Sequence, residues 1–502
     1  MMESLNYLTT GFATALTITN LLYCTAGVTF GMLVGVLPGL GPAAGTALLL
    51  PITYGLQPTT AIIMLAGIYY GAMYGGTITS VLINVPGENA SVITCLDGYA
   101  LTKQGRAGTA LGVAAIGSFV GGIASLIGLI LMGPGVAAQA LKFGPPEYFC
   151  LLMLGLTLVV SLMGKSLVKG MIIAFMGLTL SMIGIDPSVG TIRFAMGSDN
   201  LMGGIEYIAV AMGVFGFGEI FLQLEEDLKQ KIHIPKIQNM LPKKNEVPVV
   251  TKSIARGSIL GFFLGLIPGT NATMASIISY TSEKKISKHP EKFGNGAVEG
   301  VAGPETANNS FVGGSMVPLF TLGIPTSATM AILLGAFIMH GLVPGPTLFS
   351  DNPEVVWPVI ASMFIGNIIL VILNLPLANV WAQATRVPPG IMFPTIIIIA
   401  ILGIYSLNNS MFDVGTMILF GVVGYFIKKA DYPVAPLILT FILGDNIEYK
   451  FVQSMTIFRG DFTMFFKRPI SLAIIIIIVA SIVFSIVTSR KRIQKFGAEE
   501  TE

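Results

Sequence analysis

The sequence predicts an all-α polytopic membrane protein made of two related halves, and three observations support this prediction. Hydrophobic residues make up 53% of the 502 residues and charged residues 11%, against roughly 25% charged residues in a typical soluble domain. The mean hydropathy is +0.80, and many apolar runs approach the roughly 20 residues that a helix needs to cross a bilayer. Residues 31–39 (GMLVGVLPG) and 261–269 (GFFLGLIPG) are nearly the same and start 230 residues apart.

Apolar runs recur from end to end of the chain and predict its helices in order. Two or more of these runs are expected to be half-spans, so the length that a bilayer demands gives about 11–13 crossings. The predicted segments are 13–37, 58–83, 108–132, 146–163, 166–184, 204–224, 253–267, 308–323, 327–341, 355–380, 391–406, 412–428, 433–452 and 470–489.

One clear polar linker, residues 225–256, divides the chain. Its excess of Lys and Arg places it in the cytoplasm, because positively charged loops stay on that side of a membrane. We therefore expect a first membrane repeat at 1–224, the cytoplasmic linker at 225–256, a second membrane repeat at 257–460, and a C-terminal span with a basic tail at 461–502.

The landmarks of the first half recur in the same order in the second. Segments 75–77 (GGT) and 84–87 (NVPG) correspond to segments 313–315 (GGS) and 323–326 (GIPT). The preserved order indicates a two-fold internal repeat with broken helices.

Charge limits how the two halves are related. Six full crossings in the first half fit its charges but would put the lysines between 284 and 292 outside, against the positive-inside rule. An odd number of crossings per half, with one re-entrant hairpin, removes this conflict, so an inverted repeat is favoured and a parallel repeat is the alternative. The hairpins are expected at 70–100 and 308–341, with tips at 86–87 and 325–326, where non-helical backbone must line protein or water.

The Pro-Gly breaks carry the strongest indication of a ligand site, since such breaks at matched places in two halves point to a transporter binding site. Proline removes a backbone donor and kinks the helix, and glycine allows close backbone approach. The exposed N–H groups and the start of the following helix then attract an anion. The alternative is a packing kink. The candidate substrate-binding residues are Pro38, Gly39 and Gly41 in the first half and Gly269, Thr270 and Asn271 in the second.

A second polar stretch, residues 69–88, ends at another break. Hydroxyl and amide groups can hydrogen-bond a carboxylate without a full opposite charge, which suits a carrier that must release its substrate. The alternative is helix–helix packing through small and hydroxyl residues. The candidates from this stretch and its counterpart are Gly75, Gly76, Thr77, Asn84, Pro86, Pro325, Thr326 and Ser327.

Residues 303–310 (GPETANNS) combine one carboxylate, two amides and hydroxyls beside an apolar stretch. Oxygen groups of this kind suit a Na⁺ ion or a proton site, and an ionisable group inside a membrane segment is a functional candidate by default. We therefore assign cation coupling to Glu305, Asn308 and Asn309, with a helix-capping Glu305 at an interface as the alternative. Glu88, Asp97, Asp445 and Glu448 are interpreted as interfacial loop charges.

Several function classes find no support. Val159 stands where the leading glycine of a P-loop would precede Gly164-Lys165-Ser166, and neither HExxH nor GxSxG occurs. We therefore expect no enzyme and no cofactor. The net charge is +2 without a basic patch, so no nucleic-acid partner is indicated. An anion channel is the alternative of a different class.

Five long segments together carry a resemblance to a known family. They read LPGLGPAAGTALLLP (37–51), YYGAMYGGTITSVLINVPGE (69–88), LDGYALTKQGRAGTALG (96–112), FGNGAVEGVAGPETANNS (293–310) and HGLVPGPTLF (340–349). Over roughly residues 5–460 the chain resembles the large permease subunit of the tripartite tricarboxylate transporters, the TctA-type proteins.

The resemblance implies a bacterial inner-membrane importer driven by a Na⁺ or H⁺ gradient. It implies a smaller TctB-type membrane subunit and a periplasmic TctC-type solute-binding protein as partners. Citrate-like tricarboxylates or dicarboxylates would be the substrates, with aromatic carboxylates as the alternative. By analogy with other repeat-built carriers, one half is expected to move against the other. The matching motifs place function on Pro38, Gly39, Gly41, Gly75, Gly76, Asn84, Pro86, Glu305, Asn308 and Asn309.

Overall fold

The computed structural model describes residues 2–37, 39–163, 166–186, 189–225, 237–384 and 389–483. These residues are mainly helical, with one short antiparallel pair, β1 (Gly184–Ile185) and β2 (Ile192–Arg193). Among them, eight helices are long and apolar enough to cross a membrane, and five shorter apolar helices accompany them. The prediction of an all-α polytopic membrane protein is therefore confirmed, whereas the number of crossings and the domain boundaries remain predictions.

The first half runs from the N-terminus to the polar linker. Its helices are α1 (Met2–Ala15), α2 (Ile18–Val36), α3 (Gly41–Leu49), α4 (Pro58–Ile83), α5 (Val92–Thr94), α6 (Ala100–Lys103), α7 (Ala107–Ala140), α8 (Pro145–Met163), α9 (Leu167–Ser181), α10 (Tyr207–Ala211) and α11 (Gly218–Glu225). Short 3₁₀ turns at Leu50–Thr53, Asn89–Ser91 and Asp199–Leu201, and π-helical turns at Cys95–Tyr99 and Met212–Phe217, connect them.

The second half follows the linker. Its helices are α12 (Val247–Gly265), α13 (Ala272–Ile286), α14 (Glu299–Leu322), α15 (Ala328–Met339), α16 (Leu348–Asp351), α17 (Pro353–Ala384), α18 (Pro389–Asn408), α19 (Met411–Lys429), α20 (Ala435–Ile457) and α21 (Met464–Lys467). A 3₁₀ turn at Pro290–Lys292 precedes α14, and an apolar helix spans Pro469–Val483. The predicted segments omitted most of α1, all of α3 and α13, and the short helices α5, α6, α16 and α21.

Three glycines on α2 let it lie directly against α4. A Cβ placed at Gly27, Gly31 or Gly35 would come within 2.2, 2.4 and 2.1 Å of a backbone carbonyl oxygen of α4. Those oxygens belong to Met64, Ile68 and Ala72. Higher residue numbers on α2 thus contact higher residue numbers on α4, so the two helices run in the same direction. Only glycine allows this backbone approach.

The second half has the same contact between α12 and α14. A Cβ at Gly257, Gly261 or Gly265 would lie 2.6, 2.1 and 2.6 Å from a carbonyl oxygen of α14. The oxygens belong to Gly303, Ala307 and Phe311. Each of these glycines lies 230 residues after its counterpart on α2.

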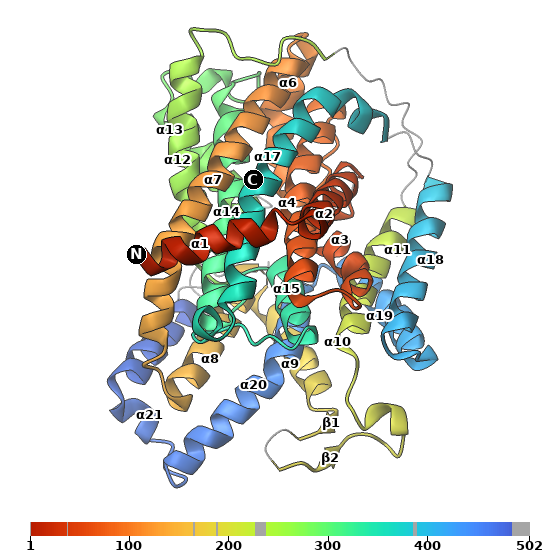
Figure 1. The fold of residues 1–502 in the computed structure, drawn as a ribbon, viewed down its shortest axis with the longest axis vertical. Coiled ribbons are helices and arrows are strands. Elements are labelled where there is room, and N and C mark those ends of the chain that lie inside the picture. Colours follow the sequence, from red (N-terminus) through yellow and green to blue (C-terminus); the bar gives the residue numbers. More distant parts are fainter. Residues whose placement is uncertain are drawn as a thin grey trace, which may run out of the picture.

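The counterpart helices α4 and α14 meet in opposite directions. The Thr77 hydroxyl donates to Glu305, and Tyr70 lines a small cavity with Asn309 and Val312, so ascending positions on α4 face descending positions on α14. This crossing supports an inverted relation between the halves, which stays a prediction. Figure 1 shows α2 and α4 near the middle of the molecule, between α12–α13 on one side and α11, α18 and α19 on the other.

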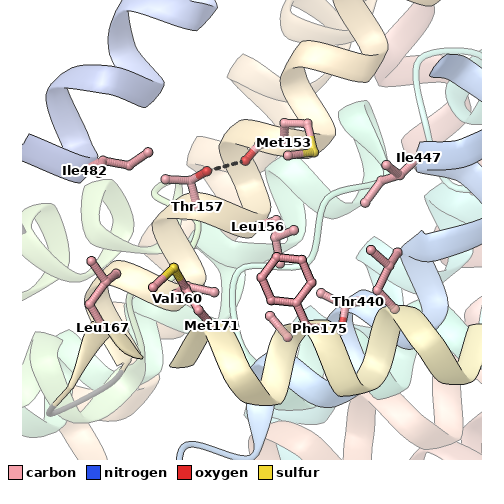
Figure 2. A pocket seen from close by; sticks show the side chains of 12 residues that line it. Met153, Leu156, Thr157, Val160, Leu167, Met171, Phe175, Thr440, Ile447 and Ile482 are labelled. Carbon is pink, nitrogen blue, oxygen red and sulfur yellow. Dashed lines mark hydrogen bonds between the residues drawn. The ribbon is translucent and has the colours of Figure 1, made fainter. Parts of the chain in front are cut away.

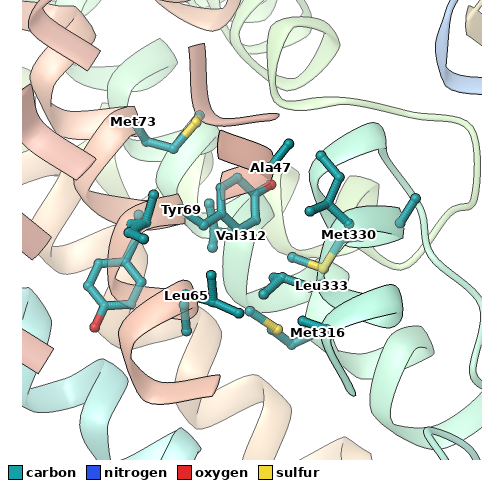
Figure 3. Packing of buried hydrophobic residues seen from close by; sticks show 14 of the residues in the cluster. Ala47, Leu65, Tyr69, Met73, Val312, Met316, Met330 and Leu333 are labelled. Carbon is teal, nitrogen blue, oxygen red and sulfur yellow. The ribbon is translucent and has the colours of Figure 1, made fainter. Parts of the chain in front are cut away.

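A continuous apolar core packs around these central helices. Side chains of α3, α4, α14 and α15 interdigitate there, as Figure 3 shows for Leu65, Val312, Met316, Met330 and Leu333. The hydrophobic span of α4 is buried on all sides. Its break is therefore held at a fixed position inside the protein.

Candidate functional site

Four breaks in the helices interrupt the central core, at the places that Pro and Gly predicted. Residues 37–40 separate α2 from α3, and residues 266–271 separate α12 from α13. Gly39 and Gly269 have the same backbone angle, φ +84°. The helices α4 and α14 end at Asn84 (φ +59°) and Gly323 (φ +68°), both left-handed, and left-handed backbone commonly ends helices.

All four breaks line one cavity of about 330 Å³, a volume in the range of small-molecule sites. Further lining comes from α11, α19 and the segment that starts α20. The lining residues are Gly39–Ala43, Tyr69, Met73, Pro86, Glu88, Asn89, Glu219, Asn271–Thr273, Ser327–Thr329, Lys428 and Pro433–Ala435.

Four helices begin at this cavity. The first residues of α3, α13, α15 and α20 all belong to its wall. Asn271 caps α13 by accepting from Met274 N at 2.8 Å, and Ser327 caps α15 by accepting from Met330 N at 3.4 Å. The first turn of α3 has no side-chain cap. Each helix start carries unpaired N–H groups and about half a positive charge, so the arrangement favours an anion.

The charged lining contains one basic and two acidic side chains among the described residues. Lys428 Nζ lies 2.7 Å from Glu219 Oε2, and Glu88 lines the wall beside the break after α4. Gly39 lies against α11, where a Cβ would come within 2.2 Å of Gln223 Nε2. Neither Lys428 nor Glu219 was among the predicted site residues.

The structure brings five of the predicted substrate-binding residues to the cavity wall: Gly39, Gly41, Pro86, Asn271 and Ser327. Pro38 lies outside the described residues. The other predicted residues do not line this cavity: Gly75, Gly76, Thr77, Asn84, Gly269, Thr270, Pro325 and Thr326.

Several of these other residues have structural neighbours that account for them. Gly75 and Gly76 lie where a Cβ would meet Met32 O at 2.4 Å and Glu88 Cγ at 2.6 Å. Thr270 donates to Leu264 O in the last turn of α12 and to Ile267 O in its own break. Gly269 N donates to Thr326 O at 3.1 Å and joins two breaks. Asn84 is exposed and ends α4.

Glu305 lies fully buried in the second turn of α14. Its carboxylate accepts from Thr77 Oγ1 at 2.7 Å, from Asn308 Nδ2 at 3.3 Å and from Thr94 Oγ1. Asn309 donates instead to Ser118 Oγ at 2.8 Å. The interpretation of Glu305 as an interfacial cap is therefore wrong, and Thr94 is a partner that the sequence analysis missed because it lies 211 residues away.

Glu88 and Asp97 are buried, so their interpretation as interfacial loop charges is also wrong. Asp97 Oδ1 accepts backbone N–H groups of Gly294, Gly296 and Ala297 at 2.8–2.9 Å, and Oδ2 accepts the Tyr280 hydroxyl at 2.9 Å. A carboxylate saturated in this way fixes the loop before α14 to the first half.

A second cavity, of about 220 Å³, lies among α8, α9, α20 and the C-terminal apolar helix (Figure 2). Its polar side chains, Thr157 and Thr440, donate to carbonyls of their own helices, Met153 O and Pro436 O. Its wall therefore offers no free polar group to a carboxylate.

Sequence comparison identifies the protein family. The model of the tripartite tricarboxylate transporter TctA family matches residues 21–439. The chain belongs to this family. It is therefore a multi-pass membrane component of a transporter, as the resemblance predicted.

Two relatives of the chain come from Agrobacterium vitis. An uncharacterized 52.8 kDa protein in the TAR-I ttuC' 3' region is 44% identical over 501 residues, which cover 100% of both chains. An uncharacterized protein in the TAR-II ttuC' 3' region is 44% identical over 242 residues, which cover 48% of this chain and 100% of that one. No solved structure matches the chain.

Proposed function

We propose that this TctA-family chain is the large permease subunit of a secondary active importer of organic carboxylates in the bacterial inner membrane. Tricarboxylates and dicarboxylates such as citrate are the first substrate class, and an aromatic carboxylate is the alternative. A small membrane subunit and a periplasmic solute-binding protein complete the transporter.

The convergence of four helix starts on one cavity supports this proposal most directly. Each start adds about half a positive charge at the cavity wall. Backbone N–H groups hold a carboxylate without a strong fixed counter-charge, so the substrate can also leave. Lys428 adds a directed donor, since an ammonium group carries three N–H bonds.

The Glu305 side chain and the groups that hydrogen-bond to it form our candidate binding site for the coupling cation. Thr77 and Thr94 donate to its carboxylate here, but a hydroxyl can rotate and present its lone pairs instead. Carboxylate, hydroxyl and amide oxygens are the ligands that a hard cation prefers, and a carboxylate alone can carry a proton. The cluster therefore suits either Na⁺ or H⁺.

The test is uptake of labelled citrate, succinate and benzoate into proteoliposomes that hold this chain, its small subunit and its binding protein. Sodium and proton gradients are imposed separately. Lys428→Met should raise the concentration for half-maximal uptake by about 30-fold, because a hydrogen bond to a charged group is worth roughly 1.5–3 kcal/mol.

Lys429→Met is the matched control, since Lys429 is the next residue and pairs with Glu225 on an exposed surface. It should stay within about twofold of the wild type, as expected for surface ion pairs. Uptake that ignores both gradients would support the anion channel instead. Equal effects of both lysine variants would remove Lys428 from the site.

A further inference from the structure

Glu88 lines the cavity described above, and one of its two carboxyl oxygens has no hydrogen-bond partner. The side chain is 5% exposed. Its Oε2 accepts from Ala90 N at 2.7 Å, whereas Oε1 is buried and has no hydrogen-bond partner. Burying an ionised oxygen without a partner is costly, so this atom calls for a proton or a ligand.

The charge of the cavity wall gives a second reason. Lys428 and Glu219 form an ion pair whose formal charges cancel. The protonation state of Glu88 therefore determines the net formal charge of the lining. Ionised Glu88 gives the wall a net negative charge and repels an anion. Protonated Glu88 leaves the wall neutral, and the four helix starts then dominate its potential.

We propose that Glu88 carries a proton into this site: in its protonated form it donates Oε1–H to a substrate carboxylate oxygen, and proton and substrate move together. This inference rests on the carboxylate import proposed above and names H⁺ as one coupling ion. Binding places an acceptor opposite the O–H, and release of the substrate leaves the carboxyl free to lose its proton.

Among the described residues that line the cavity with Glu88, Lys428 is the one cation, and Glu219 and Tyr69 are the other titratable groups. Glu305 on α14 is near enough to interact electrostatically with Glu88. The start of α13, which packs on the 3₁₀ turn after Glu88, has no charged residue within Ala272–Thr273. Lys428 lines the same cavity but is engaged by Glu219. Ala90 N is the hydrogen-bond donor to the Glu88 carboxylate, and among the described lining residues no cation other than the engaged Lys428 offsets its charge.

Glu305 cannot play the same part from its present position. Its two oxygens already receive three donors, and it does not line the cavity. The first half thus has a cavity-lining carboxyl group with one unpartnered oxygen. The second half has a carboxyl group enclosed among hydroxyl and amide groups.

The test compares the wild type and Glu88→Gln, which keeps the shape and one donor but cannot exchange a proton. Purified chain with its small subunit is mixed with citrate or succinate in weakly buffered solution from neutral to alkaline pH. Proton uptake is followed with a pH dye, and binding of the labelled acid by equilibrium dialysis.

The wild type should take up one more proton per bound acid than Glu88→Gln wherever free Glu88 is ionised. Its affinity should fall by about tenfold per pH unit on the alkaline side, because the bound form holds the proton. Glu88→Gln should bind with little pH dependence. Glu88→Asp should restore proton uptake, and Glu291→Gln, at an exposed acid, should behave as the wild type.

Equal proton uptake by the wild type and Glu88→Gln overturns the inference, and so does loss of binding at every pH in both the Gln and Asp variants. Sodium-driven uptake by a wild type whose binding ignores pH would also overturn it while leaving carboxylate import intact. A wild type that binds none of the acids would overturn both proposals.

Discussion

The break after α4 and the break after α14 differ in chemistry although their backbones agree. The helices α4 and α14 each end at a left-handed residue, Asn84 and Gly323. The segment after each helix then reaches a residue whose side chain caps the next helical turn. In the first half that residue is Glu88, and in the second it is Ser327. With the same spacing of 239 residues, Glu305 on α14 corresponds to Ala66 on α4.

The other pair of breaks differs in a related way. Gly39 and Gly269 share their conformation, but Gly41 stands where the second half has the capping Asn271. The start of α13 is therefore partly satisfied by its own side chain, while the start of α3 keeps its N–H groups for a ligand. Similar backbone geometry leaves each half free to hold different side chains.

The largest effect should come from replacing Glu305, the acid of α14 whose counterpart on α4 is an alanine. Glu305→Gln should lower gradient-driven citrate uptake by about 100-fold, near 2.7 kcal/mol, because its amide nitrogen replaces one accepting oxygen and a hydrogen bond to a charged group is worth roughly 1.5–3 kcal/mol. Initial uptake rates in proteoliposomes measure this. Glu291→Gln serves as the control, and uptake within twofold of the wild type in Glu305→Gln would show that the acid is dispensable.

The next largest effect concerns the glycine-mediated helix contact that the two halves share. Gly31→Ala and Gly261→Ala should each destabilise the protein by about 1–3 kcal/mol, because the added methyl group overlaps a backbone oxygen. Chemical unfolding in detergent measures the loss. Gly135→Ala on α7, where a Cβ meets open space, should cause no loss. A large loss in one half alone would break the proposed equivalence of the two contacts.

The smallest effect should come from placing the capping residue of the second half at the matching position of the first half. Gly41→Asn should weaken carboxylate binding by about tenfold, near 1.4 kcal/mol, because a capping amide competes for the N–H groups of α3. Asn tolerates the φ of +58° there and has room. Equilibrium dialysis measures the change, with Gly55→Asn as the open-space control. Unchanged binding would mean that α3 does not face the substrate.

The sequence predicted the breaks well because Pro and Gly act on the backbone next to them. It placed one predicted helix at 58–83, where the structure has α4. It missed α13, whose polar Ser, Thr and Lys residues lack an apolar run. It also missed the surroundings of Glu305 and the Lys428–Glu219 pair, because those contacts join residues more than 200 positions apart and no local pattern encodes them.

The Asp97 contact has a mechanical consequence. Together with Thr77 and Thr94 on Glu305, it ties first-half segments to α14. A motion that separated the two halves would break all of these bonds, at roughly 1.5–3 kcal/mol for each one to a charged group. A displacement of α11, α19 and α20 would break none of them, yet these helices supply one wall of the cavity. A hinge that runs through the cavity would therefore leave these bonds between the halves intact, whereas a hinge along the boundary would break them.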